Sequence, residues 1–152
     1  MRIQSVALLV CALLLLGLTG CPGGASRDQP DLVPVSGTVT LNGEPLAGAE
    51  VAFIPTGSTG GTGAFGSTDA SGHYELNSGG QTGAPVGEFK VAITKWVMQD
   101  GSDFEPEEGV SPIDAGAQNA LPPKFGDETA TQLTATVPDG GSDSIDFELT
   151  SQ

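Results

Sequence analysis

The chain is poor in the residues that most catalytic and metal sites require. Its 152 residues include one His, two Cys, one Trp and one Tyr. A nucleophilic triad needs a His that an acid orients, whereas His73 follows a turn in an alternating segment, the usual place of a structural surface residue. Zinc sites built from Cys and His are excluded by number. We expect no catalytic residue, no cofactor and no metal site, and therefore a protein that is not an enzyme.

Basic residues are scarce as well. The chain has five Lys and Arg against 19 Asp and Glu, which gives a formal net charge of −14. All the acidic residues follow residue 20, and the basic residues there are Arg27, Lys90, Lys95 and Lys124. Such a surface repels phosphate backbones and anionic headgroups, so the charge argues against nucleic acid as a partner.

The first 20 residues have the pattern of an export signal. Arg2 precedes an apolar run that reaches Leu16, and residues 18–21 read Leu-Thr-Gly-Cys. This run is shorter than the roughly 20 residues of a membrane-spanning helix, and Gly and Pro follow it. A plain cleaved signal would not explain a Cys at this position. The pattern predicts a lipoprotein signal peptide over residues 1–20, cleavage between Gly20 and Cys21, and a diacylglycerol on the Cys21 thiol.

Lipidation has consequences for the rest of the chain. Cys11 leaves with the signal and Cys21 carries the lipid, so no thiol remains for a disulfide. Residues 21–32, rich in Gly and Pro, predict a flexible tether. We expect the protein in the cell membrane or the outer membrane, lipid-anchored and facing the periplasm or the cell exterior. Pro22, after the lipidated Cys, gives a mild preference for the outer membrane.

Residues 33–152 predict one all-β domain. Apolar and polar residues alternate in segments separated by turn residues such as Asn42-Gly43, and no segment keeps a helical period. The pattern favours an antiparallel seven-stranded β-sandwich whose core draws on the six Phe, Trp96 and Tyr74, with Gly-rich loops at 56–63 and 77–85. The seven expected strands are residues 33–41, 50–55, 64–68, 73–76, 87–96, 130–137 and 144–149.

A long acidic loop, residues 97–123, interrupts this rhythm. A connection of this length is either functional or disordered. Its carboxylates are ligands that calcium prefers, although their spacing does not match a known calcium loop. A solvated acidic surface and a calcium- or carbohydrate-binding surface that uses residues 100–114 both remain open. The acidic residues are Asp100, Asp103, Glu105, Glu107, Glu108 and Asp114.

Three blocks of sequence carry a family resemblance. Residues 35–53 contain Gly-Thr-Val and Pro-Leu-Ala-Gly-Ala, residues 67–76 contain Thr-Asp-Ala-Ser-Gly-His-Tyr, and residues 85–91 place a Gly before a strand. The chain resembles carboxypeptidase regulatory-like domains, which belong to the transthyretin-like or prealbumin-like sandwiches. Its tail, with Leu-Pro-Pro-Lys-Phe-Gly-Asp at residues 121–127 and Leu-Thr-Ala-Thr-Val at residues 133–137, resembles a group of small bacterial lipoproteins with this one domain. The resemblance implies a noncatalytic accessory or binding module.

The sequence therefore predicts a membrane-anchored lipoprotein of the cell envelope. Its β-sandwich would serve as a structural or interaction module. The expected partners are the membrane, through the lipid anchor, and an envelope protein or polysaccharide.

Overall fold

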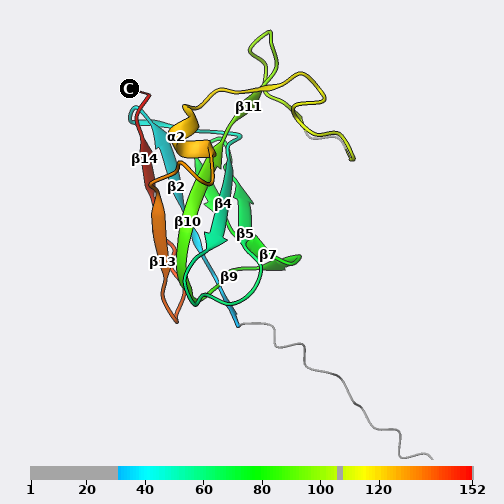
Figure 1. Cartoon of the computed structure of the whole chain (residues 1–152). Helices are drawn as coiled ribbons and strands as arrows, with labels where there is room; N and C mark the ends of the chain where they lie inside the picture. Colours follow the sequence, from blue (N-terminus) through cyan, green and yellow to red (C-terminus); the bar gives the residue numbers. More distant parts are fainter. Residues whose placement is uncertain (1–30, 106–107, 152) are drawn as a thin grey trace, which may run out of the picture.

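The computed structural model describes residues 31–105 and 108–151, which form many short strands and almost no helix (Figure 1). The single helix in this part of the chain is α2 (Pro123–Gly126). The prediction of an all-β fold is confirmed. The strands are β1 (Leu32–Val33), β2 (Ser36–Leu41), β3 (Glu44–Pro45), β4 (Glu50–Pro55), β5 (Ala64–Ser67), β6 (His73–Glu75), β7 (Asn77–Ser78), β8 (Gln81–Thr82), β9 (Ala84–Pro85), β10 (Gly87–Thr94), β11 (Trp96–Val97), β12 (Gln118–Asn119), β13 (Thr134–Val137) and β14 (Phe147–Leu149).

Two larger sheets organise the strands. One has the order β13-β10-β4-β5-β7-β8, and the other has the order β14-β2-β3 with β6 also paired to β2. Neighbours in the first sheet are antiparallel, and β10 pairs with β4 over six residues. Each of the seven segments expected as strands contains one. Inner side chains from both sheets form one core.

The last strand departs from the expected antiparallel arrangement, because β14 runs parallel to β2. The path of the chain explains this. The end of β13 lies beside the start of β10, where Val137 pairs with Gly87. The turn at Pro138, closed by the Gly141 N–H on the Pro138 carbonyl, then brings Ser142 beside Val35, at the start of β2. The chain therefore enters β14 from the end at which β2 begins.

Two expected boundaries also need correction. Residues 77–85, expected as a Gly-rich loop, contain β7, β8 and β9. β9 pairs with β1, so Leu32 already belongs to the sheet structure although it was assigned to the tether at 21–32. Each of these four strands is only two residues long, which is too short for an alternating pattern to reveal it.

The aromatic residues divide between the core and the surface. Phe53, Phe89 and Phe147 are buried together, and Phe125 of α2 is buried over β10, where Ala92 is also covered. Phe65 was expected in the core but is 52% exposed. β5 turns Ala64 inward, and neighbouring residues of a strand face opposite sides, so Phe65 faces out. Trp96 and Phe104 are only partly buried.

Tyr74 fastens the C-terminal segment to the core. Its side chain is buried, and its hydroxyl donates a hydrogen bond of 2.7 Å to the Ile145 carbonyl. Burial and the nearby Asp146 carboxylate raise the pKa of Tyr74 well above its ordinary value. The folded chain therefore keeps this phenol protonated at pH values where the unfolded chain has begun to lose the proton.

We expect this difference to make the protein sensitive to alkali. Because the folded-state pKa of Tyr74 is raised, its contribution is complete below the unfolded pKa of about 10 and declines above it, by up to about 1.4 kcal/mol per pH unit. Tyr74→Phe should cost about 1 kcal/mol at pH 7 and remove this part of the decline. Denaturant unfolding between pH 7 and 12 measures both. A decline of equal slope in the variant would contradict the prediction. As the only tyrosine, Tyr74 can also be titrated by its absorbance.

Candidate functional site

The described residues of the acidic loop and its flanks contain paired strands and turns, which we call the arm (residues 96–105 and 108–119). β11 pairs with β12 on one side, and the Val97–Asp103 bridge lies on its other side. A tight turn joins the two halves of this hairpin, with the Met98 N–H bonded to the Ser102 carbonyl. The predicted loop over residues 97–123 therefore has short strand pairings at Val97, Asp103 and Gln118–Asn119, and turns and irregular backbone make up the rest of its described length.

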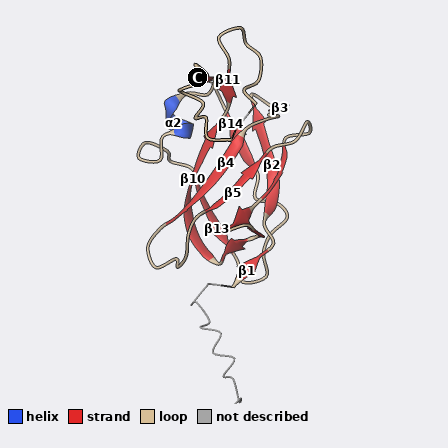
Figure 2. Ribbon diagram, turned by 90° about the vertical axis from the view of Figure 1, so that its right-hand side faces the viewer, coloured by secondary structure: helices blue, strands red, loops and turns tan. Residues whose placement is uncertain are grey.

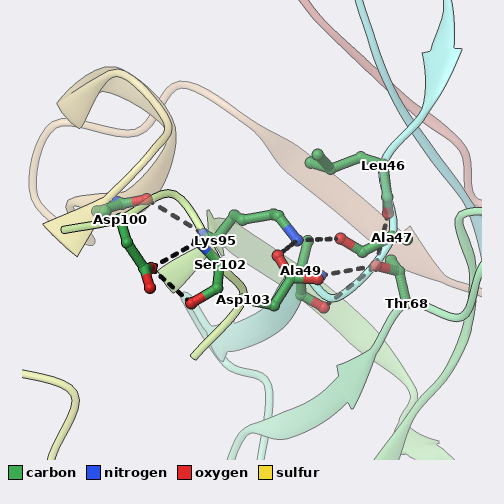
Figure 3. A network of polar contacts seen from close by, with 9 residues as sticks. Leu46, Ala47, Ala49, Thr68, Lys95, Asp100, Ser102 and Asp103 are labelled. Atoms are coloured by element: carbon green, nitrogen blue, oxygen red, sulfur yellow. Dashed lines mark hydrogen bonds and ion pairs between the residues drawn. The ribbon is translucent and has the colours of Figure 1, made fainter. Parts of the chain in front are cut away.

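A lysine ties the arm to the rest of the domain (Figure 3). Lys95 Nζ lies 2.7 Å from the Ala47 carbonyl oxygen and 2.6 Å from Asp103 Oδ1. The lysine side chain is largely buried, whereas that of Asp103 is largely exposed. Lys95 thus holds the hairpin of the arm beside the turn that precedes β4.

A buried threonine stabilises the same turn from the other side (Figure 3). Thr68 is 6% exposed; its hydroxyl donates to the Leu46 carbonyl at 2.6 Å and accepts the Ala49 N–H at 2.8 Å. The Thr68 N–H also donates to the Ala49 carbonyl, and the Gly48 N–H donates to the Thr68 carbonyl. The turn at 46–49 is therefore a rigid base for the arm.

The carboxylates of the arm do not converge. Asp103 binds Lys95, and Ser111 donates to Asp114 at 2.6 Å. Asp100 accepts the hydroxyl and the backbone N–H of Ser102, which lowers the pKa of Asp100 below its ordinary value. No group of three His, Cys, Asp or Glu that could hold a metal ion occurs among the described residues. The calcium interpretation gains no support from these residues, and Glu107 lies outside them.

A groove of about 360 Å³ lies between the arm and the larger sheet, where β4 begins and β5 ends. Trp96, Phe104, Val110 and Pro112 of the arm form its apolar side. Strands β4 and β5 contribute Glu50 and Ser67, which are paired across the sheet and exposed. The Glu50 side chain has no hydrogen-bond or ion-pair partner within residues 31–105 and 108–151. The groove thus combines aromatic and aliphatic walls with one unpaired carboxylate.

Sequence reasoning did not find this groove. It assigned Trp96 and all six Phe to the core, and it treated Glu50 only as the polar start of a strand. A usable signal was present, because Trp96 and Phe104 flank the beginning of an acidic, Pro-containing segment. Large aromatic residues outside the regular alternation are often surface binding residues.

The arm and the N-terminal strand lie at opposite ends of the domain. Figure 2 places β1 at the bottom and β11 at the top, and Figure 1 shows the same separation between β9, the partner of β1, and β11. The predicted cleavage and lipidation residues, Gly20 and Cys21, lie outside the described residues. The chain that precedes Leu32 therefore joins the domain at the end away from the groove.

Comparison with protein-family models, with curated proteins and with solved structures finds no match to this chain. Within the described parts of the chain, no helix is long and apolar enough to cross a membrane.

Proposed function

We propose that the protein is a lipid-anchored lipoprotein of the cell envelope, with a noncatalytic β-sandwich as an interaction module. The sandwich would be the seven-stranded transthyretin-like or prealbumin-like type of the carboxypeptidase regulatory-like domains. Anchoring through Cys21 places it in the cell membrane or the outer membrane, facing the periplasm or the cell exterior. Its partner would be an envelope protein or polysaccharide.

Contacts between the sequence blocks that carry the family resemblance support the proposed fold. Thr68, from the block at 67–76, bonds to Leu46 and Ala49 of the block at 35–53. The Gly72 carbonyl of the second block accepts the N–H of Val39 in the first. The motif residues in these contacts position turns and strands, which fits a module without chemistry of its own.

The Leu-Thr-Gly-Cys sequence at the end of the apolar run is the observation that carries the proposal. The arrangement of the domain agrees with it. Residues 22–31 can span at most about 35 Å, so they would hold the end with β1 close to the membrane. The groove, at the opposite end, would then face away from the lipid and be open to partners.

The anchor is tested by the intact mass of the protein purified from membranes. We expect the mass of residues 21–152 plus acyl chains. Cys21→Ala should lack the acyl mass and leave the membrane fraction, because the thiol that bears the lipid is gone. Cys11→Ala is the matched control, since Cys11 is removed with the signal and its loss should leave mass and location unchanged. A wild-type chain without lipid, or one that keeps residues 1–20, would overturn the proposal.

A further inference from the structure

The groove between the arm and β4–β5 differs in charge from an ordinary apolar surface. Residues 96–119 contain no Lys or Arg but six Asp and Glu. Lys95, which precedes the arm, is bound to Asp103 and to a backbone carbonyl. The side chain of Glu50 at the rim lacks a partner in the described part of the chain. A ligand that enters the groove therefore meets apolar walls under a negative potential.

An exposed aromatic side chain lies beside the groove, on the same strand as one of its lining residues. Phe65 lies on the same face of β5 as Ser67, pairs with Ala52 of β4, and is 52% exposed. On the arm, Val110 is 39% exposed. Exposed large apolar side chains that adjoin a groove commonly mark a site for another protein chain. Phe65 is two residues from Ser67 along β5, so a polypeptide segment in the groove would also reach the Phe65 ring.

We propose that the groove binds a basic segment of a partner protein. A Lys or Arg side chain would pair with Glu50, and neighbouring apolar side chains would lie against Trp96, Phe104 and Val110. The aromatic walls add to the attraction, because a cation is stabilised over the face of an indole or phenyl ring. This inference rests on the proposed function, since it names the site and partner chemistry of the anchored interaction module.

The chain carries its own reporter, because Trp96 is its only tryptophan. The probe is a tryptophan-free hexapeptide, Gly-Lys-Val-Lys-Val-Gly, acetylated and amidated, added to the full chain in a non-ionic detergent. We expect a saturable change in Trp96 emission with a dissociation constant on the order of 0.1–1 mM, as is usual for a short flexible peptide. Raising the ionic strength should weaken binding. Replacing Lys by Glu in the peptide should abolish it, and replacing Val by Ser should weaken it.

Variants locate the site. Glu50→Gln should weaken peptide binding about two- to fivefold, since it removes one exposed charge pair. Phe104→Ala should weaken it about tenfold or more, because aromatic wall residues carry much of the energy at such sites. Glu88→Gln is the control. Glu88 is also exposed on the larger sheet, but it lies at the far end of β10, six residues from Thr94, the partner of Glu50.

Three results would overturn the groove proposal. The first is no saturable change in emission up to about 10 mM peptide. The second is an equal loss of binding in Glu88→Gln and Glu50→Gln. The third is a response to neutral cell-wall oligosaccharides with none to the basic peptide, which would make the groove a carbohydrate site. The anchor is judged separately: a lipidated chain that ignores the peptide overturns the groove alone, and an unlipidated chain that binds it overturns the anchor alone.

Discussion

Gly37→Ala is expected to destabilise the domain by about 3 kcal/mol, or to prevent its folding. Gly37 lies on β2, the middle strand of the smaller sheet, and pairs with Tyr74 of β6. Residues 142–146, the segment before β14, lie beside β2 at this position. A Cβ atom at this position would overlap the backbone carbonyl of Ile145. The clashing group is main chain, so no side chain can rotate away to relieve it. The segment must move as a whole.

That movement would break other bonds. The Ile145 carbonyl accepts the Tyr74 hydroxyl, and the Ile145 N–H donates to Ser36 at 3.1 Å. The Thr38 N–H also donates to the Asp146 carboxylate at 2.7 Å. Displacing the segment therefore leaves the buried phenol of Tyr74 without its acceptor, which is costly in itself.

The measurement is the free energy of unfolding in denaturant, followed by far-ultraviolet circular dichroism. Gly60→Ala is the matched control, because a Cβ at Gly60 meets nothing within 4 Å. The control should be as stable as the wild type or slightly more stable, since alanine restricts the unfolded chain. Equal stability of the two variants would show that the C-terminal segment does not depend on the missing side chain at residue 37.

Local features of this fold could be predicted from the sequence because they depend on neighbouring residues. The turn at 69–72 is an example. An Asp at the start of a turn is expected to accept hydrogen bonds from the backbone N–H groups that follow it, and the Asp69 carboxylate accepts them from Ser71 and His73. Alternation also located the expected strands. In β13, for example, Ala135 and Val137 are buried whereas Thr134 and Thr136 are exposed. Tyr74 and Leu76 were correctly placed inward on this basis.

Features that join distant segments could not be predicted in this way. The parallel pairing of β14 with β2 depends on where β13 ends in space, and no local pattern records that. The groove likewise combines residues 48–50 and 67 with Trp96, Phe104, Val110 and Pro112. Residue type predicts Phe65 and Trp96 in the core. Their exposure depends instead on which face of a short strand points toward the core, and in β5 that is the face of Ala64.

The arm also shows why composition alone was a poor guide to function. Its acidic residues suggested calcium, yet Asp100 and Asp114 accept hydrogen bonds from serines of the arm, and Asp103 is paired with Lys95. These carboxylates stabilise turns and the attachment of the arm. The groove that the arm forms is lined mainly by its apolar residues, and the proposed contact with a partner depends on Glu50 of the sheet.

The arm and groove can function only if the core holds both sheets in place, and Phe53 is the residue on which this depends most. It is fully buried on β4, in contact with Phe89 of its own sheet at 5.6 Å between ring centroids. Across the core it meets Phe147 of the other sheet edge-on at 6.1 Å, and the Tyr74 ring at 6.4 Å. One ring thus joins strands from both sheets.

Phe53→Ala is expected to cost about 3–5 kcal/mol, because it removes a buried ring and leaves a cavity that the paired strands cannot close. Phe65→Ala, on the neighbouring strand, is the matched control and should change stability by no more than about 0.5 kcal/mol, since Phe65 is exposed. Denaturant unfolding of both variants gives the comparison. A typical domain is stable by about 5–15 kcal/mol. The described residues contain no Cys, so no disulfide among them adds to this stability. The Phe53 variant should therefore lie close to its unfolding threshold. A small loss at Phe53, similar to that at Phe65, would mean that the two sheets are held together elsewhere than at this aromatic cluster.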